Sequence, residues 1–220
     1  MGDLQQAKEL SERTLDIQLG NRGTEYVRVA LTEDNSGEVH QQLVDLQRAK
    51  EYYERTLNIQ LKKLRPEHIA VALTNHGLGD VHLDLCDPRR AKEYYERALD
   101  IRLKELGTEH LDVALSCHTL GVVCRQLGDL QRAKEHFARA IDIKLEGLGP
   151  SHVNVALTYH NLGVTHRQLG DLQRAKEHIE CALDIQLKNL GTMHVDVAGT
   201  SYSLGNVYLE MGDLHQAKIN

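Results

Sequence analysis

The chain has 220 residues, of which 41% are hydrophobic but only 4% aromatic, so leucine and small side chains must fill its core. Its formal net charge of -6 and its sequence pI of about 6.1 argue against a nucleic-acid-binding protein, which usually carries a strong basic bias. The sequence has no apolar run long enough to span a bilayer and no basic and apolar leader, so we expect a cytoplasmic protein without a membrane partner. The four cysteines are then expected to be reduced and buried.

One short motif recurs at a constant spacing along the chain. The tripeptide Gly-Asp-Leu begins at Gly2, Gly128, Gly170 and Gly212, and two further copies have Val44 and Cys86 in the glycine position. Each copy begins 42 residues after the one before it. A constant period without insertions is typical of a solenoid, in which each unit buries its apolar face only against its neighbours.

Each repeat contains two helical patterns, which we name helix A and helix B. In the third copy, small and apolar residues follow the spacing of one helix face, at Val113, Cys117, Leu120, Gly121 and Cys124. Gly128 can adopt the left-handed conformation that ends this helix A, and Asp129 can cap the start of helix B. Helix B stops at Leu148-Gly149. The pattern predicts an all-α solenoid.

The repeats divide residues 1–220 into a single array. We expect a half repeat at 2–23, full repeats at 24–65, 66–107, 108–149 and 150–191, and a partial repeat at 192–220. The first helix A departs most from the pattern, since Glu33 and Ser36 replace an inward tyrosine and a core leucine. We expect that helix to be the least stable one.

Both ends of the array lack the neighbouring helix that the pattern calls for, so the chain resembles a piece of a longer array. Apolar side chains should then be uncovered on the first helix B, at Leu4, Ala7 and Leu15, and on the last helix A, at Leu204, Val207 and Tyr208. Exposed apolar patches mark association sites, so the open ends are expected to favour self-association.

The small and large positions of the repeat resemble the tetratricopeptide repeat. They are found at Leu78, Gly79, Ala91, Tyr95 and Ala98, at Leu120, Gly121, Ala133, Phe137 and Ala140, and at Leu162, Gly163, Ala175, Ile179 and Ala182. The 42-residue length and the pattern Leu-Gly-x-x-His-x-x-Val-Ala, with His110, His152 and His194, are similar to the kinesin-light-chain and nephrocystin subclass. This resemblance implies a right-handed superhelix of antiparallel helix pairs, whose A helices line a concave groove that binds peptides or helices.

The family pattern also indicates which residues of the A helices face that groove. The candidate peptide-binding residues are His76, Asp80, His118, Val122, Arg125, His160, Asn161, Val164, Arg167, Tyr202 and Asn206. Kinesin light chains hold a peptide backbone with an Asn-Asn pair, of which only Asn161 matches here. The arginines favour an acidic or amphipathic partner segment. If His118 and His160 gain charge near pH 6, binding should tighten as the pH falls from about 7.5 to 6.

These residues favour a non-catalytic scaffold for protein-protein interaction. The thirteen histidines mostly fall in repeat columns, and no Cys-x-x-Cys, His-Glu-x-x-His or phosphate-binding loop is found, so we expect no metal, no cofactor and no enzyme activity. One alternative is a ligand-recognition segment of a larger signalling or ATPase-sensor protein. Another is a designed or consensus-like array, against which the irregular first helix A argues.

Overall fold

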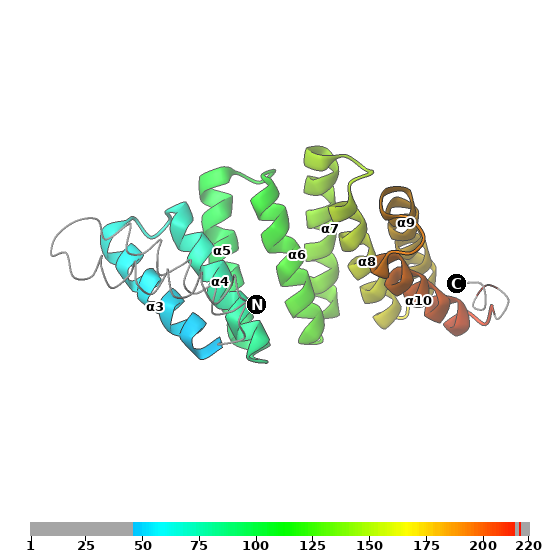
Figure 1. Cartoon of the computed structure of the whole chain (residues 1–220), viewed down its shortest axis with the longest axis horizontal. Helices are drawn as coiled ribbons and strands as arrows, with labels where there is room; N and C mark the ends of the chain where they lie inside the picture. The colour runs from blue at the N-terminus through cyan, green and yellow to red at the C-terminus, as the bar shows by residue number, and fades with distance from the viewer. Residues whose placement is uncertain (1–45, 214–215, 217–220) are drawn as a thin grey trace. The chain divides into compact units, whose positions relative to one another are not determined.

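The computed structural model describes residues 46–213 and residue 216, and their regular structure is entirely α-helical (Figure 1). The chain divides into two compact units, Met1–Gly107 and Thr108–Asn220. The described helices of the first unit are α3 (Leu46–Lys63), α4 (Ile69–Asp84) and α5 (Pro88–Leu106). Those of the second unit are α6 (Leu111–Gln126), α7 (Leu130–Leu148), α8 (Val153–Gln168), α9 (Leu172–Leu190) and α10 (Val195–Glu210). The all-α fold expected from the sequence is confirmed.

The even-numbered helices are the A helices of the repeat, and the odd-numbered ones are the B helices. The expectations for the first helix B, for the first helix A with Glu33 and Ser36, and for Leu4, Ala7 and Leu15 lie outside the described residues. That residues 1–220 form one continuous array stays a prediction.

Each helix B that follows a described helix A begins with an aspartate cap. Asp129 accepts a hydrogen bond from the backbone N–H of Arg132 at 3.3 Å, while Gly128 before it has φ of 79°. Cys86 stands in the same place in the first unit and takes φ of 59°, which is uncommon for a residue other than glycine. The predicted end of helix A and start of helix B at residues 128 and 129 therefore agree with the structure.

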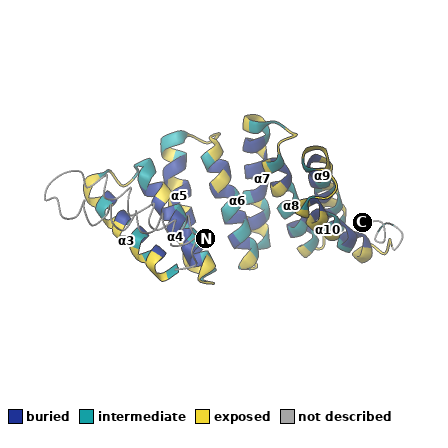
Figure 2. Cartoon of the chain, viewed as in Figure 1, coloured by how far each residue is buried: buried dark blue, intermediate teal, exposed yellow. Residues whose placement is uncertain are grey.

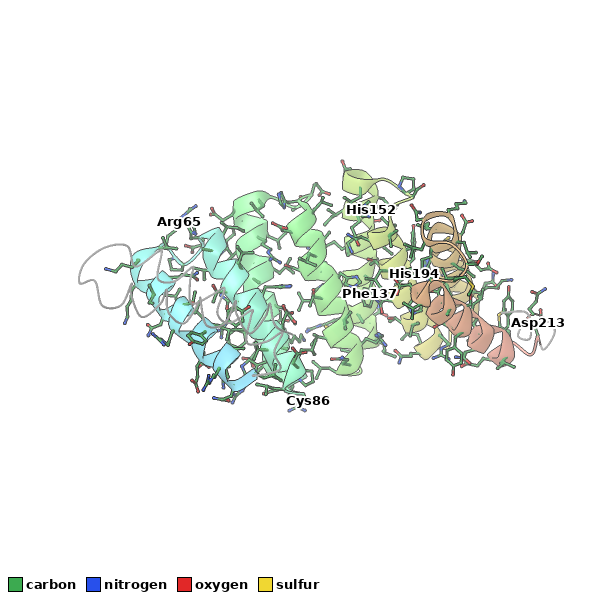
Figure 3. All side chains as sticks on the ribbon, in the orientation of Figure 1. Arg65, Cys86, Phe137, His152, His194 and Asp213 are labelled. Carbon is green, nitrogen blue, oxygen red and sulfur yellow. The ribbon has the colours of Figure 1, made fainter. Side chains whose placement is uncertain are left out.

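Each described helix A begins with a histidine cap, a role that the repeat spacing of these histidines does not reveal. His152 and His194 stand at the starts of α8 and α10 (Figure 3), and the Nδ1 atom of His152 accepts a hydrogen bond from the N–H of Asn154 at 3.1 Å. His68, His110 and His194 make the same bond two residues along the chain. A side-chain acceptor at this position satisfies one of the backbone donors that every helix start leaves unpaired.

A glycine of helix A lets helix B approach closely. Phe137 on α7 is fully buried (Figure 3), and a Cβ atom added to Gly121 on α6 would lie 2.7 Å from its ring. Gly163 on α8 meets Ile179 on α9 in the same way, at 2.5 Å. The faces where such helices meet are buried, while their outer faces remain exposed (Figure 2). In the core of each unit, a glycine of helix A thus packs against a large side chain of helix B.

The last described helix A is better covered than the sequence suggested. Leu204, Val207 and Tyr208 on α10 are buried and form one cluster with Ala175 and Ile179 of α9. The expectation that these three side chains are uncovered is therefore wrong, because the preceding helix B already covers them. The three apolar side chains that were expected to drive self-association at this end are therefore not available for it.

Two further findings concern the environment of the chain. No described helix combines the length and the apolar character needed to cross a membrane. All four cysteines are free, and Cys117 and Cys124 are buried as expected, but Cys86 and Cys181 are exposed.

Candidate peptide-binding surface

Three A helices of the second unit carry most of the predicted binding residues. Helices α6 and α8 contact each other, and so do α8 and α10. On their shared side lie three strongly exposed apolar residues, Leu115 (43% exposed), Leu157 (47%) and Tyr202 (71%). The partly buried residues of this side are His118, Val122, Arg125, His160, Val164, Arg167 and Asn206. We call these ten residues the A-helix surface.

Hydrogen bonds between neighbouring A helices fix the two histidines of this surface. His118 Nδ1 on α6 shares a hydrogen bond with Thr158 Oγ1 on α8, at 3.1 Å. His160 Nδ1 on α8 shares the same kind of bond with Thr200 Oγ1 on α10, also at 3.1 Å. The threonines are buried and the histidines partly so. The histidines therefore join adjacent helices and are not free to meet a ligand with Nδ1.

A buried lysine completes the polar contacts beneath His118. Lys144 on α7 donates from Nζ to Thr158 Oγ1 at 2.9 Å and to the carbonyl of Asn154 at 3.2 Å. Burial lowers the pKa of Lys144 to about 8. Burial, with a smaller contribution from Lys144, lowers the pKa of His118 to about 4.

Burial argues against the predicted protonation of the surface histidines near pH 6. The pKa of His160 is also lowered, first by burial and then by the nearby Arg125. In both imidazoles burial disfavours the charged form, because that form would lose its hydration. Tighter binding over that range is no longer expected from these groups.

Arg125 on α6 is the cation of the surface that has no ionic partner among the described residues. Its guanidinium is partly buried, its Nε atom has no hydrogen-bond partner, and no acidic residue of the described part of the chain pairs with it. Burial lowers the pKa of the guanidinium, although arginine remains charged at any ordinary pH. A charge held in this way is stabilised by any carboxylate that approaches it.

The equivalent arginine one repeat later is already paired. Arg167 Nη1 on α8 donates to Glu210 Oε1 on α10 at 3.2 Å. Gln168 stands where Glu210 would stand one repeat earlier, so the repeat supplies no carboxylate for Arg125 at that position. The two arginines are equivalent in the sequence but not in their surroundings.

Asn161, the predicted residue that matches the Asn-Asn pair, bonds to its own helix. Asn161 Nδ2 donates to the carbonyl of Leu157 at 3.2 Å, one turn earlier in α8. Its side chain is only partly buried, so it can exchange this bond for one to a ligand.

The predicted binding residues of the first unit engage each other. On α4, His76 Nε2 lies 3.8 Å from Asp80 Oδ2, and the hydroxyl of Tyr95 on α5 donates to Asp80. The His76 ring also packs on the Tyr95 ring, with centroids 5.1 Å apart. Burial raises the pKa of Asp80, although His76 and Tyr95 act in the opposite direction. These groups form a cluster of their own rather than an open acidic surface.

The described residues hold no group of three histidine, cysteine or acidic side chains that could bind a metal ion. The histidines that recur at three positions of the repeat instead have structural roles. One column caps the A helices, one joins neighbouring A helices, and the third, with His82 and His166, is buried inside each unit.

The repeat, the helix pairs and the A-helix surface together define a class of protein. The chain belongs to the tetratricopeptide repeat family, whose sequence model matches residues 29–104, 69–146, 112–188 and 154–219. Proteins of this fold are typically non-catalytic scaffolds for protein-protein interaction. The array is of the kinesin-light-chain type, as its repeat length and its structural neighbours agree. No curated protein sequence matches it significantly.

Solved structures share this fold over most of the chain. BtubC (BKLC) from P. vanneervenii is 24% identical with a TM-score of 0.80, covering 99% of this chain and 85% of that one. A putative kinesin light chain of Podosopora anserina with nearly identical TPR-like repeats is 25% identical with a TM-score of 0.77, covering 90% of this chain and 93% of that one. YrrB, a TPR protein with an unusual peptide-binding site, is 18% identical with a TM-score of 0.62, covering 96% and 88%.

Proposed function

We propose that this protein is a scaffold that binds a segment of a partner protein across the A-helix surface of its second unit. The observation that carries the proposal is Arg125, a partly buried cation that has no ionic partner in the part of the chain that the structure describes, on a surface that also exposes Leu115 and Leu157. Leaving a partly dehydrated charge unpaired costs stability, and a partner's carboxylate would offset that cost. The ligand that fits is an extended or helical segment with acidic and apolar side chains.

The apolar side chains of the surface supply the second part of the recognition. Leu115 and Leu157 occupy the same repeat position on adjacent A helices, and Tyr202 lies on the next one. Covering each of them removes apolar area from water, which stabilises a complex by about 25 cal/mol per Å² before the costs of association. A segment that places apolar residues across α6, α8 and α10 would thus bury apolar area, and gain binding free energy, at each of these helices.

We further propose that the protein acts by binding alone, without catalysis, and that it works in the cytoplasm. The side chains of the A-helix surface are used here only to bind a partner. Four free cysteines, two of them exposed, fit a reducing compartment such as the cytoplasm. The likeness to YrrB, whose structure is described as having a peptide-binding site, supports a peptide as the ligand.

Random 16-residue peptides selected for binding to the full chain provide the probe for this proposal. For the selected peptides we expect enrichment of Asp or Glu near apolar residues, and Kd raised at least about tenfold by Leu157→Glu and by Arg125→Ala. Leu187→Glu on α9 and Arg174→Ala on α9 are matched controls, since both side chains are exposed on a helix B. If the control variants weaken binding as much as the surface variants do, the peptides bind elsewhere and the proposal fails.

A further inference from the structure

The first unit contains a cavity that is separate from the predicted groove. It has a volume of about 280 Å³ and lies between α3, α5 and the first half of α4. Leu57 and Leu61 of α3 and Ile101 of α5 line it, together with Asn75 of α4. His76 and Asp80, the groove residues of α4, do not line it. An apolar cavity of roughly 150 Å³ is already large enough to hold a benzene ring.

Asn75 is an unusual residue to find in the wall of this cavity. It is only 3% exposed, and its Nδ2 atom donates to the carbonyl of Val71 at 2.7 Å, which fixes the orientation of the amide. Its Oδ1 atom is buried and has no hydrogen-bond partner among the described residues. A buried polar atom without a hydrogen-bond partner lowers the stability of the fold, and unfilled space beside it lowers the stability further. A buried polar group of this kind calls for a specific explanation.

The second unit shows what can fill the equivalent place. Two repeats after Asn75 the chain has Tyr159 on α8, in the same position of helix A. Its side chain packs against the cluster of Val155, Ala156, Ala182 and Ile185 and also against the Phe137 cluster, and its ring stacks on His178 with centroids 5.8 Å apart. Val155, Ile185 and Leu145 correspond to the lining residues Val71, Ile101 and Leu61. Among the described residues of the first unit, only Leu57 packs against both equivalent clusters.

The mouth of the cavity is accessible and carries no dominant charge. Leu61 is 49% exposed, and the α3–α4 loop that follows Arg65 (Figure 3) contributes Pro66. Two basic and two acidic side chains surround the lining, at Arg97, Lys104, Glu67 and Asp100. Arg97 lies over the Tyr94 ring, with Cζ 5.5 Å from the centroid. The opening therefore suits an uncharged apolar group better than an ion.

We infer that this cavity binds an aromatic side chain, of the size and shape of tyrosine, presented by a partner protein. The ring would take the place that Tyr159 takes in the second unit, between helices α3 and α5 and against Asn75. The site is independent of the A-helix surface, so the failure of either proposal leaves the other standing.

Titration of the methyl-labelled full chain with p-cresol, which is the tyrosine side chain alone, tests the inference. We expect saturable shifts of the Leu57, Leu61 and Ile101 methyl resonances, and N-acetyl-tyrosinamide should cause them too. Asn75→Tyr should fill the cavity, raise the Tm and reduce the p-cresol affinity at least about tenfold. Ser201→Tyr, at the same repeat position on α10, is the matched control and should leave the titration unchanged.

The reciprocal variant Tyr159→Asn should lower the Tm and create a second p-cresol site beside Leu145 and Ile185. The inference is overturned if p-cresol shifts none of the three lining methyls, or if Asn75→Tyr binds it as well as the natural chain does. It is also overturned if p-cresol binds but N-acetyl-tyrosinamide does not, because the mouth would then exclude a ring carried on a protein backbone.

Discussion

At the scale of single residues, histidine has several separate tasks in this repeat. The sequence shows His110, His152 and His194 at one repeat position, but spacing alone did not reveal their role. In the structure their Nδ1 atoms cap the A helices. Histidine is not among the usual capping residues, so pattern rules that search for Ser, Thr, Asp or Asn miss it.

The cap at His152 can be tested by substitution. His152→Ala should lower the free energy of unfolding by about 0.5–2 kcal/mol, because it removes the acceptor for the Asn154 N–H. His152→Asn places another acceptor there and should retain most of the stability. Urea unfolding of both variants checks this, and equal losses would show that the bond contributes little.

The buried position of His118 makes stability depend on pH. Its pKa is about 4 in the folded chain but about 6.5 when unfolded, so below pH 6.5 the unfolded state binds a proton that the folded state does not. The contribution of the neutral His118 to the folding stability is fully present above pH 6.5 and is lost as the pH falls toward 4.

His118→Asn should remove this dependence while still allowing a bond to Thr158. The stability of the natural chain relative to the variant should fall by on the order of 1–3 kcal/mol between pH 7 and 4.5. Chemical unfolding at a series of pH values measures it. Parallel curves for the two proteins would contradict the buried, neutral imidazole.

At the scale of helices, the apolar pattern predicted most of what the structure shows. The face expected from Val113, Cys117, Leu120 and Cys124 is buried, and helix B of that repeat ends at Leu148 as predicted. What the pattern could not show is which residues of neighbouring A helices touch. The bond from His118 to Thr158 joins residues 40 positions apart, and such contacts depend on how far each helix is rotated about its axis.

The close approach of helices A and B should make two similar glycine substitutions act in opposite directions. Gly163→Ala would place Cβ 2.5 Å from Ile179 and 3.0 Å from the carbonyl of Ala175, so we expect a loss of about 1–3 kcal/mol in the free energy of unfolding. The Cβ of Gly199→Ala on α10 meets no atom of the described residues within 4 Å and should add about 0.5–1 kcal/mol through helix propensity. A stable Gly163→Ala variant would mean that the helices can separate at little cost.

At the scale of the whole molecule, residues at the same position of the repeat can have different surroundings. Arg125 and Arg167 stand at the same repeat position, yet only Arg167 has a carboxylate, from Glu210. Asn75 and Tyr159 also share a position, and one lies beside a cavity while the other fills its place. The sequence could predict the fold from what the repeats share. The candidate sites depend on where the repeats differ, and the effect of each difference appears only when the neighbouring helix is known.

The proposed peptide-binding surface is tested most directly by locating a selected peptide on the folded chain. We expect intermolecular nuclear Overhauser effects from peptide protons to the methyl groups of Leu115 and Leu157, on adjacent A helices, and none to Leu187 on α9. Contacts to Leu187 without contacts to Leu115 and Leu157 would place the ligand on the B helices and contradict the account.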